Sequence, residues 1–135
     1  MDGEGGGSQP DADDIPPSDL VFRRIPHGYW DKKSLRPNPT NFKGVDWEGV
    51  SVEWSRHSDP EKCRSHTDRP LEPAGVVKLL VGAVRRIDQL KVKHRPEVER
   101  PEHSLILGEN LGRDATRVKV ELADLCEWAI PPPTK

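Results

Sequence analysis

The segment DATRVKVELADLCEWAI, residues 114–130, decides the fold class, because it predicts one long amphipathic helix at the end of a series of strands. Apolar side chains recur in it every three or four residues, the spacing that places them on one face of a helix. They are Ala115, Val118, Leu122, Leu125, Cys126 and Ala129. Asp114 is the expected N-cap, and Pro131 is expected to end the helix because proline has no amide hydrogen to donate.

Segments rich in β-branched and aromatic residues precede this helix and predict strands. They lie at 20–25, 45–54, 74–87, 89–94 and 103–108. In the third segment we expect a strand, a turn near Gly82 and then further extended chain. A short helix over about 60–66 is predicted from Pro60, with Ser58 or Asp59 as its cap. Together these elements predict an α+β fold, a small, mostly antiparallel sheet packed by the long C-terminal helix and the short helix, and rich in loops.

The composition predicts one domain with a small core. The chain has 135 residues, of which 33% are hydrophobic and 33% charged. Residues 1–19 contain six acids and no lysine or arginine, so we expect a disordered acidic tail there, a single domain over 20–131 and a flexible C-terminus over 132–135. No apolar run is long enough to span a bilayer and no secretory signal is recognisable, so the expected location is the cytoplasm, without a membrane partner.

The stretch GVSVEWSRHSDPEKCRSH, residues 49–66, contains residue types that bind metals or act as nucleophiles. His57, Cys63 and His66 are soft or borderline ligands, and the spacing of Cys63 and His66 occurs in zinc loops. A closed site needs a fourth ligand from elsewhere, so a metal site is kept as an alternative, and the primary expectation is no metal and no other cofactor. Cys63 as a nucleophile would need a base beside its thiol. The simplest interpretation is a strand that leads into a polar helix.

A second alternative is a nucleotide site built on two strands. Arg23 and Arg24 end the first strand, and Ser51 and Glu53 share one face of the second. A guanidinium fork holds phosphate or carboxylate, and a nearby hydroxyl orients it. This set is similar to that of small NAD-consuming ADP-ribosyltransferases, in which a basic residue of the first strand, a hydroxyl and a late glutamate surround the nicotinamide ribose. The resemblance implies a nucleotide-using enzyme with Arg24, Ser51 and Glu53 in its site, although the chain lacks that family's later Glu-x-Glu or Gln-x-Glu strand.

Basic residues near aromatic ones favour a third alternative, the binding of single-stranded nucleic acid. They gather in RRIDQLKVKHR, residues 85–95, and around Tyr29 and Trp30. Acids interleave with them, which weakens this hypothesis. The loop GENLGRDAT, residues 108–116, differs from a phosphate-binding Walker loop in glycine spacing and in its Arg-Asp pair, so we expect only a turn and a helix start there.

The primary hypothesis is a small protein that acts by binding another macromolecule, as an accessory or regulatory partner of a protein. Tryptophan and arginine are the residues that most often anchor such interfaces. The candidate partner-binding residues are Tyr29, Trp30, Arg85, Arg86 and Trp128. Trp47 or Trp54 is expected to fill the core instead. No residue is assigned a catalytic role by this hypothesis.

Overall fold

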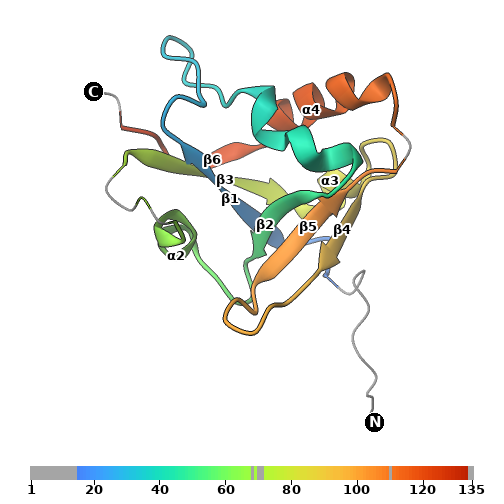
Figure 1. Ribbon diagram of the computed structural model, residues 1–135, viewed down its shortest axis with the longest axis horizontal. Coiled ribbons are helices and arrows are strands. Elements are labelled where there is room, and N and C mark those ends of the chain that lie inside the picture. Colours follow the sequence, from blue (N-terminus) through green and yellow to red (C-terminus); the bar gives the residue numbers. More distant parts are fainter. Residues whose placement is uncertain (1–14, 68, 70–71, 110, 134–135) are drawn as a thin grey trace.

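The computed structural model describes residues 15–67, 69, 72–109 and 111–133, which form a six-stranded antiparallel sheet with helices on both faces (Figure 1). The strands stand in the order β4-β5-β2-β1-β3-β6. Their bounds are β1 Leu20–Pro26, β2 Val50–Trp54, β3 Ala74–Leu80, β4 Lys91–His94, β5 His103–Leu107 and β6 Glu127–Ile130. The predicted α+β class with an antiparallel sheet is confirmed.

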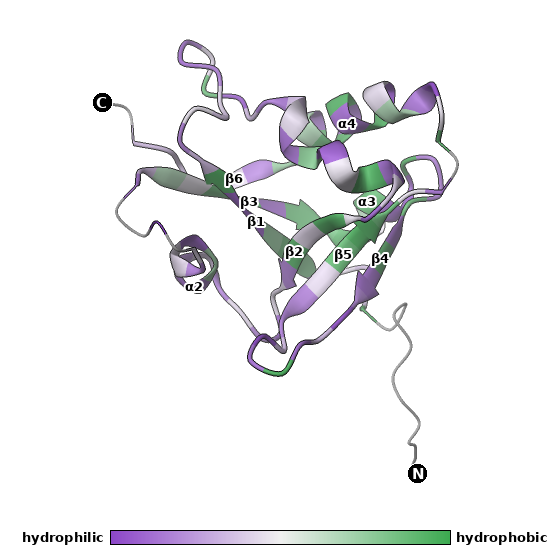
Figure 2. Ribbon diagram, viewed as in Figure 1, coloured by the Kyte–Doolittle hydropathy of each residue, from purple (hydrophilic) through white to green (hydrophobic). Residues whose placement is uncertain are grey.

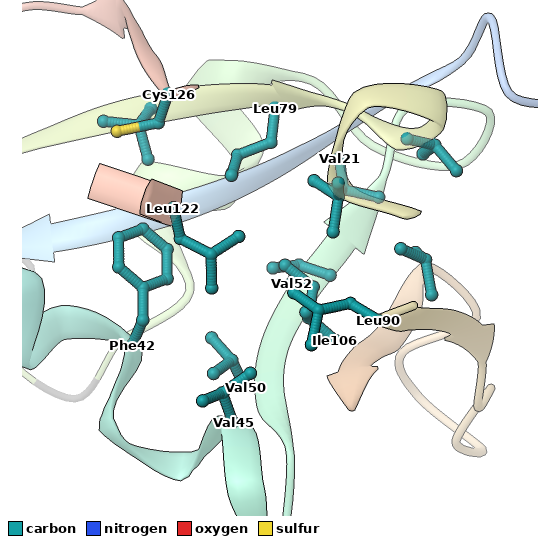
Figure 3. Packing of buried hydrophobic residues seen from close by; sticks show 14 of the residues in the cluster. Val21, Phe42, Val45, Val50, Val52, Leu79, Leu90, Ile106, Leu122 and Cys126 are labelled. Carbon is teal, nitrogen blue, oxygen red and sulfur yellow. The ribbon is translucent and has the colours of Figure 1, made fainter. Parts of the chain in front are cut away.

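One face of the sheet carries the main core, covered by α4 (Asp114–Leu125) and the 3-10 helix η2 (Pro39–Asp46). Val118 and Leu122 of α4 are fully buried, as the helical stripe predicts. Leu122 reaches into the space between Phe42 of η2 and Val52 of β2 (Figure 3). The long C-terminal helix is therefore confirmed as the element that closes the core.

The opposite face of β1 and β3 is covered by α2 (Pro60–Ser65). Cys63 of this helix packs on Phe22 and Val76 in a smaller apolar cluster. Asp59 caps the helix, because its carboxylate accepts a hydrogen bond of 2.9 Å from the amide of Lys62. Figure 2 shows hydrophobic residues gathered in the strands and hydrophilic ones along the longer loops.

Two segments differ from the sequence prediction. The chain after Leu80 forms a helix, α3 (Val81–Arg85), where extended chain was expected. The chain has to cross here from β3 to β4, which lies at the far edge of the sheet. A helical turn on this path buries both Val81 and Val84, which are three residues apart and so lie on one face of the helix.

The last helix is also shorter than predicted. It ends at Leu125, and Glu127–Ile130 form β6, which pairs with β3. Pairing with an open sheet edge satisfies backbone groups that a longer helix would have satisfied internally, so the edge overrides the helical periodicity. At the other end, Arg113 rather than Asp114 occupies the N-cap position, without a side-chain hydrogen bond.

Both predicted termini fall partly within the described residues. Residues 1–14 of the tail expected at 1–19, and residues 134–135 of the C-terminus expected at 132–135, lie outside them. Ile15, which was assigned to the tail, is fully buried in the main core, and Pro132 is buried as well. Packing therefore begins five residues before the expected boundary. Among the described residues, no helix combines the length and the apolar content that crossing a membrane requires.

Candidate ligand-binding cleft

The two central strands of the sheet, β1 and β2, pair at one end only. β1 pairs with β3 along all seven of its residues, but with β2 only where Val21 faces Trp54 and Phe22 faces Glu53. Beyond these pairs the two strands diverge toward η2 (Figure 1). Side chains from both strands, α2 and η2 line an open cleft of about 750 Å³ at this gap.

The cleft brings together Arg24, Ser51 and Glu53, the three residues of the nucleotide-site hypothesis. Four cationic side chains and two carboxylates line it: Arg23, Arg24, Lys43, Arg100, Glu48 and Glu53. Guanidinium and ammonium groups remain charged at neutral pH, so positive charge is in excess along the wall. Such a surface attracts anions.

Arg23 bridges the gap between the diverging strands. One terminal nitrogen of its guanidinium donates a 2.7 Å hydrogen bond to the backbone carbonyl of Ser51. Its Nε is buried without a partner among the described residues. Burial lowers the pKa of the Arg23 guanidinium, because the charged form loses solvation. A partly unsatisfied cation is thus held where the sheet opens.

Arg24 lies on the α2 side of β1. Its Nε donates to the carbonyl oxygen of Arg64, at the end of α2, over 2.9 Å. Its two terminal nitrogens form no hydrogen bond with any other described residue, so they remain able to bind a ligand.

Glu53 stands at the α2 end of the cleft and is almost completely buried. The sequence pattern places it on the exposed face of its strand, but the segment after β2 and the turn before β5 cover that face. Oε1 of Glu53 accepts from the Ser58 hydroxyl at 2.6 Å, and Oε2 lies 2.7 Å from Nδ1 of His66 and 3.3 Å from Arg100. Three donors therefore satisfy this buried carboxylate.

Glu102 is a second buried carboxylate in the same cluster. Its Oε2 lies 3.5 Å from both His66 Nδ1 and Arg100 Nε. Ligand atoms of Glu53, His66 and Glu102 lie within 4.8 Å of one another, a set of oxygen and nitrogen donors that suits a divalent cation. Arg100 already pairs with both carboxylates here, so a cation would compete with its guanidinium for their oxygens. Glu102 and Arg100 could not be found from the sequence, because only the pairing of β5 with β2 carries the turn before β5 to Glu53.

The three residues of the alternative metal site do not form one ligand cluster among the described residues. Within the described part of the chain, His66 shares its ligand cluster with Glu53 and Glu102, and not with His57 or Cys63. His57 stacks on His94, with ring centroids 5.8 Å apart. Burial, followed by the charge of Glu53, raises the pKa of the Cys63 thiol above its usual range, which disfavours the thiolate that a nucleophile or a zinc ligand requires.

A serine and a histidine meet beside the cleft. Ser51 Oγ lies 3.3 Å from Nε2 of His103, and Nδ1 of that ring lies 2.8 Å from the carbonyl oxygen of Arg95. His103 stands directly across from Glu53 in the β2–β5 ladder, so its ring reaches Ser51 diagonally. The sequence pattern indicated Ser51 as a site residue, but it gave no sign that His103 lies beside it.

The candidate partner-binding residues do not form one patch of free side chains. Trp30 and Trp128 pack against each other edge to face at 6.4 Å and against the main core. Arg85 donates to the backbone carbonyls of Ile15 and Val92. Tyr29 is 45% exposed and lines the cleft, and Arg86 is exposed.

Trp47 is the tryptophan that solvent reaches most. It was expected, as an alternative to Trp54, to fill the core, but it is 73% exposed, whereas Trp54 is buried at 4%. The indole nitrogen of Trp47 donates to the carbonyl of Lys43, which holds the ring beside η2. Periodicity could not show this, because Trp47 follows η2 and precedes β2, outside any regular element.

No protein-family model, no curated protein and no solved structure matches this chain.

Proposed function

We propose that the protein binds a small anionic molecule of nucleotide size in the cleft between β1 and β2. The observation that carries the proposal is the convergence of Arg24, Ser51 and Glu53 on one cleft whose wall has an excess of cationic side chains. Ligand pockets commonly have volumes of about 300–1,000 Å³. The value of about 750 Å³ lies within that range and leaves room for a base, a sugar and phosphates.

The side chains divide the cleft into parts with different chemistry. Arg24 and Lys43 supply charge for phosphate or carboxylate groups. Tyr29, which is partly exposed on the same lining, supplies an aromatic surface for a planar base. Glu53 is engaged with Ser58, His66 and Arg100, so it is not free to act as the glutamate of an ADP-ribosyltransferase, and we propose binding only.

The test is calorimetric titration of the full chain with ADP, and with adenosine as the matched uncharged probe. We expect ADP to bind and adenosine to bind at least about tenfold more weakly, because the phosphates account for the charge contacts. Arg24→Ala and Lys43→Ala should each weaken ADP binding, whereas Arg113→Ala, an exposed arginine outside the cleft, should not. Absence of ADP binding at millimolar concentration, or unchanged affinity in both cleft variants, would overturn the proposal.

A second candidate function is the binding of a protein partner, which the exposure of Trp47 favours. A tryptophan that is 73% exposed presents a large apolar surface, and such side chains are common interface anchors. Trp47→Ala should then abolish association with a co-purifying protein while leaving the thermal midpoint unchanged. If native purification recovers the same partner with Trp47→Ala as with the wild-type chain, this tryptophan does not anchor an interface.

A further inference from the structure

The hydrogen bonds around His103 fix which of its nitrogens carries a hydrogen. The Arg95 carbonyl oxygen, 2.8 Å from Nδ1, can only accept, so Nδ1 must be the donor. In the neutral ring Nε2 then has a free lone pair. The Ser51 hydroxyl, 3.3 Å away, is therefore the donor in the second hydrogen bond.

This arrangement is that of an activated nucleophile. A hydroxyl lies within reach of a base, and a third group holds the base in the correct tautomer. Here Ser51 is the hydroxyl, His103 is the base, and the carbonyl of Arg95 takes the orienting role that a carboxylate takes in a Ser-His-Asp triad.

The surroundings of Ser51 fit a reaction in which negative charge develops. Ser51 is exposed on the lining of the cleft, so a ligand held there can reach its hydroxyl. One terminal nitrogen of Arg23 donates a hydrogen bond to the backbone carbonyl oxygen of Ser51, which brings a positive charge to the same residue. Fixed positive charge near a developing oxyanion lowers the barrier to its formation.

We propose that Ser51 is a catalytic nucleophile, with His103 as its general base, for the hydrolysis of a carboxylic ester that carries an anionic group. This inference rests on the proposed function, because the cationic wall would hold the anionic part of the ester while Ser51 meets its carbonyl carbon.

The proposed reaction has two steps. Ser51 Oγ forms a bond to the carbonyl carbon as its proton passes to His103 Nε2, and the bond from that carbon to the leaving alcohol breaks as the alcohol takes the proton from Nε2. Water then gives a proton to Nε2 and attacks the acyl carbon, and the bond to Oγ breaks as Oγ recovers the proton. One ester and one water become one acid and one alcohol, and no redox partner is needed.

The test is covalent labelling of the full chain with a fluorophosphonate, which reacts with activated serines and releases fluoride. Intact-mass and peptide analysis should find one adduct, on Ser51. Ser51→Ala should abolish it, while Ser65→Ala should keep it, since the Ser65 hydroxyl faces only the Lys62 carbonyl. His103→Gln should lower the labelling rate by about 100-fold or more, the usual contribution of a general base. His94→Gln is the matched control, because His94 also bonds a carbonyl, that of Pro101, but no serine.

A fluorophosphonate carries no anionic group, so its reaction does not depend on the cationic wall of the cleft. The labelling therefore tests the nucleophile separately from the binding of anions. Labelling of Ser51 that depends on His103 supports the nucleophile, even if ADP does not bind. Labelling that is absent, that falls on another residue, or that proceeds at the wild-type rate in a folded His103→Gln variant overturns it, even if ADP binds. Circular dichroism and the thermal midpoint of each variant show that it is folded.

Discussion

His66 Nδ1 lies 2.7 Å from Oε2 of Glu53, a contact that joins the end of α2 to the central strand β2. A carboxylate only accepts, so the histidine nitrogen donates. Because Arg100 also reaches this carboxylate, from the turn between β4 and β5, the Glu53 side chain connects three segments that are distant in sequence. The floor of the cleft at this end is therefore polar, buried and fixed.

Glu53→Gln should lower the free energy of unfolding by about 1–3 kcal/mol, because an amide NH₂ would face donors where a carboxylate oxygen now accepts. Urea denaturation measures the change. Glu61→Gln is the control: Glu61 forms an exposed ion pair with Arg64, and its loss should change stability by about 0.5 kcal/mol or less. Equal stability of Glu53→Gln and wild type would show that the cluster does not hold α2 against the sheet.

The elements that the sequence predicted correctly are those whose local pattern agrees with their tertiary environment. β1 and α2 have strand or cap signals that nothing else in the fold opposes. β6 was missed because Glu127–Ile130 continue a helical periodicity, and only the open edge of β3 makes extended pairing the better solution.

The cleft could be anticipated only in part, for the same reason. Ser51 and Glu53 lie on one strand two residues apart, so alternation alone puts them on one face. His103, Arg100 and Glu102 reach the site through the pairing of β5 with β2, a long-range relation that no single-sequence pattern contains. The burial of Glu53 likewise depends on segments that fold over its face.

Leu122→Ala should destabilise the protein by about 2–5 kcal/mol, the usual cost of truncating a buried leucine. Leu122 of α4 is fully buried against the sheet, and its truncation would leave a cavity between Phe42 of η2 and Val52 of β2 (Figure 3). Lys119→Ala, on the same helix but off the buried stripe, should change stability by about 0.5 kcal/mol or less. Similar effects for the two substitutions in chemical denaturation would contradict the assigned core.

Cys126 should make the stability of the protein fall at alkaline pH. Burial raises the pKa of its thiol to about 11, from a usual value of 9.0. The folded state disfavours the thiolate. The stability that the protonated thiol contributes is therefore fully present below pH 9 and is lost as the pH rises toward 11. Wild type should lose about 2–3 kcal/mol more than Cys126→Ala over this interval. Denaturation at each pH measures the free energy of unfolding of both proteins. If wild type and Cys126→Ala lose the same amount, the thiol has the same pKa in the folded and the unfolded state.

Arg23→Met should separate stability from binding. The side chain of Arg23 is half-buried, its Nε is buried without a partner among the described residues, and its firm contact is one hydrogen bond to the Ser51 carbonyl. Replacing a partly buried, incompletely paired charge by an apolar side chain of similar length is often neutral or stabilising. We therefore expect the free energy of unfolding to stay within about 1 kcal/mol of wild type, or to rise, while the affinity for ADP falls by at least about tenfold.

Unchanged or higher stability together with weaker ADP binding would indicate that Arg23 contributes to ligand binding at a cost in stability, as functional residues often do. Arg117→Met gives the comparison, since Arg117 is paired on the protein surface with Asp88 and Glu121, away from the cleft. This variant should leave ADP affinity unchanged. If Arg23→Met instead unfolds the domain and denaturation shows a loss of several kcal/mol, Arg23 serves to join β1 to β2, and the positive charge that binds the ligand must come from Arg24 and Lys43.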